Sequence, residues 1–238
     1  MKIERPIIAL DFPDKQTVDN FLKKFPANQQ LFVKIGMELF YSEGQTMVQE
    51  LIAAGHDVFL DLKCHDIPHT VEAAMRVIGK LGVKLTTIHA SGGTSMMEAA
   101  VSGLLDGSNG DPSAKILAIT QLTSTTEMQL HQEQLVTASM QTSVLNYAAL
   151  AQQAGLGGVV CSAWEAAAIQ AQSQPNFLRV TPGIRLAGNS HDDQKRVMTP
   201  DQAASNGSSA IVVGRAITQA ADPVAAYQLV EKLWRKQV

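Results

Sequence analysis

Eight short apolar runs alternate along the chain with amphipathic or alanine-rich segments, and this alternation restricts the fold more than any other feature. The runs are rich in β-branched residues and span residues 7–12, 31–36, 58–63, 85–90, 116–122, 158–161, 177–181 and 210–214. The segments expected to be helical span residues 15–25, 43–54, 71–81, 94–105, 140–154, 164–171, 200–205 and 223–234. Continuously apolar strands separated by helices are typical of a parallel sheet that is buried on both faces. We therefore predict a (β/α)8 TIM barrel that forms a single domain over residues 1–238, with an open doubly wound sheet as the alternative.

The composition excludes several classes of partner. Apolar residues make up 45% of the chain and charged residues 17%, as expected for a globular protein with a large core. A net charge of −3 provides no overall basic field for nucleic acid or an anionic membrane. We see no apolar run near the ~20 residues that span a bilayer, and the first residues do not resemble a signal peptide. The two cysteines cannot form a disulfide framework, which is typical of a protein from the reducing cytoplasm. Together these features predict a soluble cytoplasmic protein with no nucleic-acid or membrane partner.

Polar side chains gather where the predicted strands end. In a parallel barrel, the C-terminal ends of all strands converge on one face, which carries the active site. Two unusually long connections, residues 123–139 and 183–199, would lie on the same face, where long loops are commonly functional. The strand ends therefore predict one pocket surrounded by cations and carboxylates, formed by Asp11, Lys34, Asp61, Lys63, Asp66, His89, Thr123, Arg185, Gly214 and Arg215.

The third strand end carries an acid and a base two residues apart. The side-chain period of a strand places Asp61 and Lys63 on one face. A buried strand rarely holds two such charges unless they are paired or functional, so a purely structural ion pair remains an alternative. A metal site that combines Asp61 with His65 and His69 also remains open, although the spacing matches no standard ligand motif.

Other strand ends suggest a helix start and an anion site. Asp66 and Thr70 precede the next expected helix and can cap it, with Pro68 in its first turn. Gly214 and Arg215 follow the last strand, where barrels often bind phosphate through backbone N–H groups. The sequence therefore predicts a phosphate contact at this end, which Arg185 would reinforce.

The motifs at these strand ends resemble those of the bacterial orotidine 5′-phosphate decarboxylases over essentially the full length of the chain. An Asp-x-Lys-x-x-Asp segment alone is shared by a wider superfamily of phosphosugar enzymes, whereas six matches in order at strand ends are specific. The matching segments are Ala9-Leu10-Asp11, Val33-Lys34-Ile35-Gly36, Asp61-Leu62-Lys63 through Asp66-Ile67-Pro68 and Thr70, Gln121-Leu122-Thr123-Ser124, Val180-Thr181-Pro182-Gly183-Ile184-Arg185, and Val213-Gly214-Arg215.

The resemblance implies a lyase of pyrimidine biosynthesis that converts orotidine 5′-monophosphate to uridine 5′-monophosphate (UMP) and carbon dioxide, with no cofactor and no metal. It implies that Lys63 protonates the ring carbon that loses carbon dioxide. It places Asp61 beside the scissile carboxylate, in an alternating charge network with Lys34, Lys63 and Asp66. A fixed ammonium beside a developing carbanion both stabilises that charge and can supply the proton.

The resemblance also implies the binding contacts and a dimer. Asp11 and Lys34 would bind the ribose, and Thr123 the pyrimidine. Asp66 and Thr70 would reach into the site of a second subunit, so the enzyme would be an obligate homodimer. The phosphate would be held under a closing loop by Arg185, Gln194, Gly214 and Arg215, and Pro182 completes the substrate-binding set.

Three alternative functions remain. A metal-dependent sugar-phosphate decarboxylase or aldolase would resemble this chain at Asp61, Lys63 and Asp66. Such enzymes carry a glutamate metal ligand where this chain has Lys34, which favours the metal-free reaction. A Schiff-base aldolase using Lys34 or Lys63 is less favoured, since neighbouring carboxylates blunt the nucleophilicity of a lysine. A non-catalytic sensor of phosphoribosyl ligands would leave the intact charge network without a role.

Overall fold

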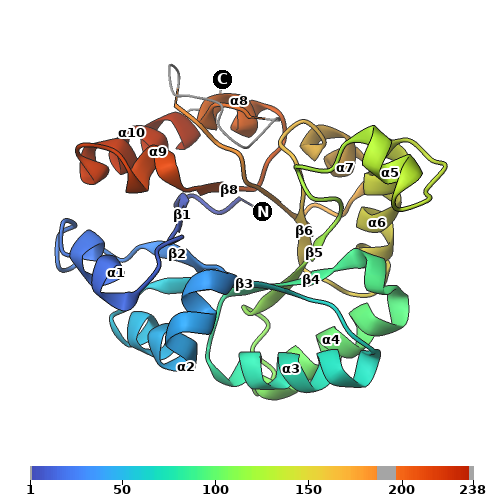
Figure 1. Cartoon of the computed structure of the whole chain (residues 1–238), viewed down its shortest axis with the longest axis horizontal. Coiled ribbons are helices and arrows are strands. Elements are labelled where there is room, and N and C mark those ends of the chain that lie inside the picture. Colours follow the sequence, from blue (N-terminus) through green and yellow to red (C-terminus); the bar gives the residue numbers. More distant parts are fainter. Residues whose placement is uncertain (1, 187–196, 236–238) are drawn as a thin grey trace.

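The eight strands form a closed parallel barrel in the computed structural model, which describes residues 2–186 and 197–235 (Figure 1). Each strand pairs in parallel with its neighbour in sequence, and the last pairs with the first. The prediction of a TIM barrel is therefore confirmed, and the open doubly wound sheet is wrong. The strands are β1 (Ile7–Ala9), β2 (Phe32–Ile35), β3 (Asp57–Cys64), β4 (Leu85–His89), β5 (Lys115–Ile119), β6 (Gly158–Val160), β7 (Leu178–Thr181) and β8 (Ala210–Val213).

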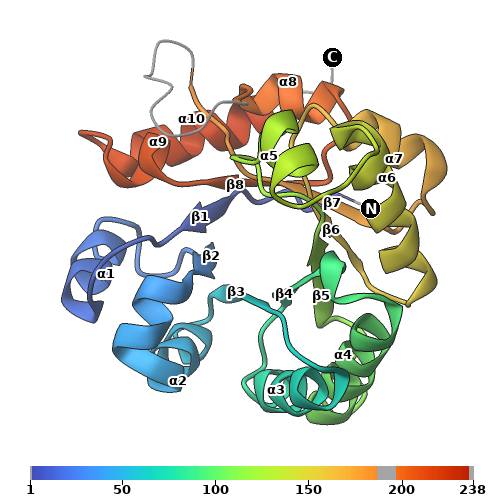
Figure 2. The ribbon, with the colours of Figure 1, turned by 45° about the vertical axis from the view of Figure 1, so that its right-hand side comes forward.

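The helices form a ring outside the barrel (Figures 1 and 2). Their apolar faces pack against the outward side chains of the strands, as amphipathic helices in this architecture do. They are α1 (Lys15–Leu22), α2 (Met37–Ala53), α3 (Pro68–Lys80), η1 (Ala90–Gly92, a 3₁₀ turn), α4 (Thr94–Gly107), α5 (Glu127–Gln132), α6 (Met140–Gln153), α7 (Ala166–Gln172), α8 (Pro200–Ser205), α9 (Arg215–Thr218) and α10 (Pro223–Arg235).

Strand alternation divides the core into two layers. Ile8, Val33 and Leu60 belong to the larger layer between strands and helices. Their strand neighbours Ile7, Phe32 and Phe59 belong to a separate cluster that fills the barrel. Because successive strand side chains point to opposite faces, two residues beyond Phe32 and Phe59 the inward rows continue with Lys34 and Asp61. The strand pattern thus directs both charged groups toward the barrel interior.

Helices α3 and α4 approach each other closely through glycines. A Cβ atom at Gly103 would overlap the carbonyl oxygen of Glu72, and one at Gly107 would overlap that of Arg76. From the opposite side, a Cβ atom at Gly79 would lie 2.7 Å from the carbonyl oxygen of Leu104. The two helices therefore pack backbone against backbone, which only residues without a side chain permit.

Several elements differ from the predicted bounds. Helix α2 begins at Met37 rather than residue 43, with a kink at Gly44, where φ is 68°. The connection predicted at residues 123–139 contains α5, whose start is fixed by a capping box between Thr126 and Gln129. Helix α9 and the turn η1 were also not predicted; both are short elements at strand ends.

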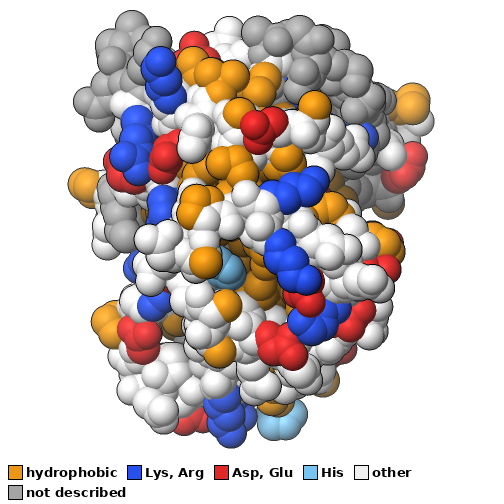
Figure 3. All heavy atoms as spheres, turned by 90° about the vertical axis from the view of Figure 1, so that its left-hand side faces the viewer, with side chains coloured by type: hydrophobic (Ala, Val, Ile, Leu, Met, Phe, Trp, Pro, Cys, Tyr) orange, Lys and Arg blue, Asp and Glu red, His pale blue; other side chains and the backbone are white. Residues whose placement is uncertain are grey.

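Acidic and basic side chains are interspersed on the face shown in Figure 3, in keeping with the small net charge. Among the described helices, none combines the length and the hydropathy needed to cross a membrane.

Candidate active site

A cavity of about 530 Å³ lies at the C-terminal end of the barrel. The residues that line it come from strand ends and loops widely separated in sequence, as expected for the active-site face of a TIM barrel. Nine of the residues predicted for the site line this cavity: Asp11, Lys34, Asp61, Lys63, Thr123, Pro182, Arg185, Gly214 and Arg215.

Four of these residues form an alternating chain of charges. The Nζ atom of Lys34 lies 2.9 Å from Oδ1 of Asp11 and 3.8 Å from Oδ2 of Asp61. That same Oδ2 atom lies 3.0 Å from Nζ of Lys63. Lys34 is only 8% exposed, so its ammonium depends on these carboxylates to offset the loss of hydration. At the end of this series of charges, the Lys63 ammonium lies at the cavity wall and is paired with Asp61.

The backbone at Lys63 departs from a regular strand. Its φ is +53°, which lies in the left-handed region that residues with a Cβ rarely adopt. The pairing of β3 with β4 shifts register between Leu60 and Cys64, around this residue. The following Cys64 packs against the larger core cluster outside the barrel, and burial raises the pKa of its thiol.

The two arginines predicted to hold phosphate lie along the same cavity. Arg215 is the first residue of α9, directly after Gly214. Arg185 is 8% exposed, and its Nη1 atom donates a hydrogen bond to the carbonyl oxygen of Ile184 at 3.0 Å. Gln194, the remaining predicted phosphate ligand, lies outside the described residues.

Asp66 and Thr70 do not line the cavity of their own chain. Both lie in an exposed stretch, residues 65–70, in which Ile67 is 65% exposed. The Oδ1 atom of Asp66 accepts a hydrogen bond from the backbone N–H of Ile67 at 2.7 Å. Pro68 occupies the first turn of α3 as expected, but the N-cap position is Ile67, so neither Asp66 nor Thr70 is the N-cap residue.

Comparison with known proteins assigns the family. The model described as "Orotidine 5'-phosphate decarboxylase / HUMPS family" matches residues 4–230. The chain belongs to this family.

Relatives within the orotidine 5′-phosphate decarboxylase family align over whole chains. The orotidine 5′-phosphate decarboxylase of Ligilactobacillus salivarius is 65% identical over 237 residues, covering 100% of both chains. That of Enterococcus faecalis is 54% identical and covers 98% of this chain and 99% of its own. A crystal structure of orotidine 5′-phosphate decarboxylase from Lactobacillus acidophilus has a TM-score of 0.88 and 41% identity, covering 98% of this chain and 99% of that one. These findings confirm the predicted enzyme class, a carbon–carbon lyase of UMP biosynthesis.

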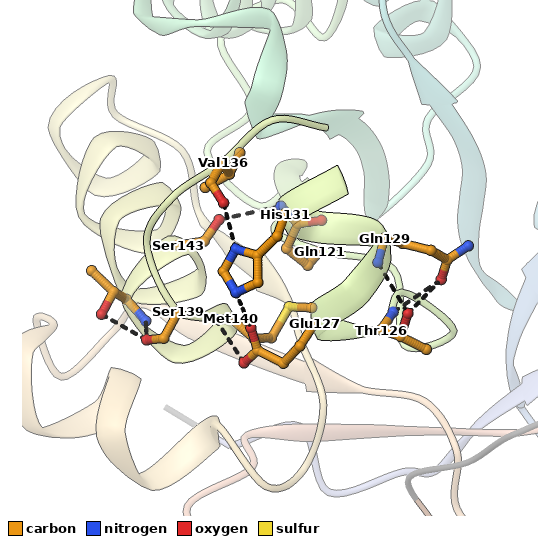
Figure 4. A network of polar contacts seen from close by, with 10 residues as sticks. Gln121, Thr126, Glu127, Gln129, His131, Val136, Ser139, Met140 and Ser143 are labelled. Carbon is orange, nitrogen blue, oxygen red and sulfur yellow. Dashed lines mark hydrogen bonds and ion pairs between the residues drawn. The ribbon is translucent and has the colours of Figure 1, made fainter. Parts of the chain in front are cut away.

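The structure adds residues that the sequence interpretation gave no role. Gln121 lines the cavity next to Thr123, and its Nε2 atom lies 3.2 Å from both Oγ of Ser143 and Oε1 of Gln134. Figure 4 shows Gln121 beside Ser143 on helix α6, and the contact with Gln134 connects Gln121 to the segment after α5. Gln121 lies within a motif that the sequence supplied, but its partners become apparent only in three dimensions.

A histidine holds the segment after α5 (Figure 4). Nδ1 of His131 lies 2.6 Å from the carbonyl oxygen of Val136, and Nε2 lies 3.2 Å from Oε2 of Glu127. Glu127 also accepts the backbone N–H of Met140, the first residue of α6, at 3.0 Å. Both ring nitrogens of His131 thus face oxygen atoms. These contacts join α5, the segment that follows it and the first residue of α6.

The predicted histidines lie apart from the cavity lining. The rings of His65 and His89 pack with centroids 5.6 Å apart. Burial, followed by the charges of His65 and Lys63, lowers the pKa of His89. Within residues 2–186 and 197–235, no three side chains of His, Cys, Asp or Glu are arranged to hold a metal ion.

Proposed function

We propose that this enzyme decarboxylates orotidine 5′-monophosphate to UMP and carbon dioxide without a cofactor, and that Lys63 is the proton donor. The observation that carries the proposal is the alternating charge chain, which ends with the Lys63 ammonium 3.0 Å from Asp61 at the cavity wall. Family membership and full-length relatives of the same name support the substrate.

The chemistry requires a positive group beside one ring carbon. When the bond between that carbon and the carboxylate breaks, its electron pair stays on the ring as a carbanion. The Lys63 ammonium, fixed before the reaction, stabilises this charge and then transfers its proton to the carbon. Asp61 would lie beside the departing carboxylate and hold Lys63 in place through Oδ2.

The rest of the cavity suits the remote parts of a nucleotide. Asp11 and Lys34 would contact the ribose, and Thr123 and Pro182 the pyrimidine side of the cavity. Arg185, Gly214 and Arg215 would hold the phosphate together with Gln194, since a phosphate of about −1.5 to −2 charge needs local cations. Binding energy from this distant group can support the chemical step.

A homodimer would complete each site. Asp66 and Thr70 are exposed and do not line the cavity of their own chain, although the family resemblance assigns them to the site. The neighbouring Ile67, 65% exposed, provides apolar surface for a subunit contact. We infer that Asp66 and Thr70 enter the site of the partner subunit. The two free cysteines, Cys64 and Cys161, suit a reducing cytoplasm.

The metal-dependent sugar-phosphate reaction, present elsewhere in the superfamily, is less consistent with Lys34. Where those enzymes would place a glutamate ligand, this chain holds an ammonium 3.8 Å from Asp61. A divalent cation at that carboxylate would be repelled by the neighbouring positive charge.

An absorbance assay with orotidine 5′-monophosphate in the presence of a chelator tests substrate and metal independence together. We expect conversion to UMP at a rate that added magnesium does not change. Absence of turnover would refute the assigned substrate. Turnover that stops with chelator and returns with magnesium would instead support a metal-dependent mechanism.

A further inference from the structure

We propose that Thr87, on strand β4, is a positioning residue that fixes both the backbone of Lys63 and the carboxylate of Asp61. Its side-chain oxygen Oγ1 accepts a hydrogen bond from the backbone N–H of Lys63 at 2.9 Å. The same hydroxyl donates to Oδ1 of Asp61 at 2.9 Å. Thr87 is fully buried, so water does not compete for either bond. The inference rests on the proposed function, because it concerns the proton donor of that reaction.

The direction of both bonds is determined by chemistry. A backbone N–H can only donate, so the Thr87 oxygen must accept from Lys63. The single hydroxyl proton is then available for Asp61, whose carboxylate oxygen accepts it. The hydroxyl thus joins the proton donor and its neighbouring carboxylate through one atom.

The bond to Lys63 supports an unfavourable backbone conformation. A φ of +53° at a residue with a side chain costs about 1–2 kcal/mol and persists only where surrounding contacts impose it. The regular register between β3 and β4 is interrupted between Leu60 and Cys64. At this interruption a side-chain hydroxyl, rather than a strand carbonyl, receives the Lys63 N–H. The Thr87 bond therefore helps to select the conformation from which the Lys63 side chain enters the cavity.

The bond to Asp61 sets the rotation of its carboxylate. With Oδ1 engaged by Thr87, Oδ2 is the oxygen that faces both ammonium groups, at 3.0 Å from Lys63 and 3.8 Å from Lys34. Without the hydroxyl, the carboxylate is free to turn and the Lys63 ammonium to follow it. A displacement of about 1 Å at a reacting group can lower a rate by about 100-fold.

The neighbouring residue provides a matched control. Thr86 lies on the same strand and is also fully buried, but its hydroxyl has no hydrogen-bond partner among the described residues. Thr86→Val and Thr87→Val therefore make the same change of atoms at adjacent buried positions. Only the second removes bonds to Lys63 and Asp61.

The test compares Thr87→Val, Thr87→Ser and Thr86→Val with the wild-type enzyme. For Thr87→Val we expect kcat to fall by about 10- to 100-fold, while KM and the dissociation constant of UMP change by less than about threefold. Thr87→Ser, which keeps the hydroxyl, should recover most of kcat, and Thr86→Val should leave it unchanged. Unchanged kcat in Thr87→Val, or equal losses in the two valine variants, would overturn the proposal. If Thr87→Val does not fold, Thr87→Cys, with its weaker S–H donor, takes its place. In that variant too, kcat should fall while the dissociation constant of UMP stays nearly unchanged.

A second measurement does not depend on the reaction. In ¹⁵N-labelled protein, the Lys63 amide should shift and exchange its hydrogen faster in Thr87→Val but not in Thr86→Val. An unchanged Lys63 amide would refute the positioning role. Failure of the wild-type enzyme to decarboxylate the substrate would instead refute the proposed function. The amide measurement would then still decide whether Thr87 fixes the backbone of Lys63.

Discussion

The Oδ2 atom of Asp61 lies 3.0 Å from the Nζ atom of Lys63, two residues further along the same strand. The side chain of Asp61 is 13% exposed and that of Lys63 is 26% exposed, so the pair lies at the border between barrel core and cavity. At such a border the lysine is held by protein on one side and faces the cavity on the other.

Replacement of Lys63 by alanine should remove the proton donor. We expect decarboxylation to fall by at least about 10³-fold, because the variant loses both charge stabilisation and the proton. The circular dichroism spectrum and UMP binding should persist, since the barrel and the arginines are untouched. Near-normal turnover would show that another group protonates the ring.

Mixing two inactive variants tests the shared site. In a dimer of one Lys63→Ala subunit and one Asp66→Ala subunit, one site combines an intact Lys63 with an intact Asp66 from the partner. Random reassociation should therefore restore roughly one quarter of wild-type activity. Activity that stays at the level of the separate variants would exclude sharing of Asp66.

Replacement of Arg215 by alanine should weaken phosphate binding. Loss of a charge-assisted contact of about 1.5–3 kcal/mol corresponds to about 10- to 150-fold weaker UMP binding, measured by calorimetry. Binding of uridine, which lacks the phosphate, should change little. Arg235→Ala, at the exposed end of α10, provides the control and should bind UMP as the wild type does.

Replacement of Gly103 by alanine should separate α3 from α4. The new Cβ atom would overlap the carbonyl oxygen of Glu72, and because both groups belong to regular helices, the helices must move apart. We expect the free energy of unfolding to fall by about 3 kcal/mol, measured with urea. The control Ser102→Ala, an exposed neighbour on α4, should change it by less than about 0.5 kcal/mol. Equal stability of the two variants would contradict the close helix contact.

The stability of the protein should fall in mild acid, in part through His56. Burial, followed by the charge of Arg5, lowers the pKa of His56, whose Nδ1 atom accepts the backbone N–H of Leu31 at 3.2 Å. Because the unfolded chain then binds a proton more readily than the folded one, the free energy of unfolding decreases as the pH falls below about 6.5.

The variant His56→Asn keeps an acceptor near the same position but does not titrate. Its free energy of unfolding should therefore decline less between about pH 7 and pH 5 than that of the wild type. Identical pH profiles for wild type and His56→Asn would exclude this histidine as a source of acid sensitivity.

Strand alternation explains why much of the site was predictable. The period of two that places Phe32 and Phe59 inside the barrel also directs Lys34 and Asp61 inward. Closure of the barrel then gathers strand ends that are far apart in sequence, which brings Arg215 to the same cavity as Asp61.

The features that escaped prediction depend on contacts across the fold. Thr87 is linked to Lys63 across 24 positions of sequence, through a register shift that no local pattern reveals. A positive φ at a lysine likewise has no sequence signature, unlike one at glycine. Helix α9 has only 4 residues and α5 only 6, too few for hydrophobic periodicity to show. The position of Asp66 in a second subunit's site also remains a prediction.

Under the proposed mechanism, the positive φ of Lys63 makes stability and catalysis favour different residues at this position. Glycine would adopt this backbone without strain, whereas every side chain that can donate a proton adopts it at a disadvantage. Directed evolution for thermal stability alone should therefore tend to enrich Lys63→Gly and yield a more stable but inactive barrel. Selection for a more heat-stable enzyme would therefore have to select for turnover as well, because the two requirements favour different residues at position 63.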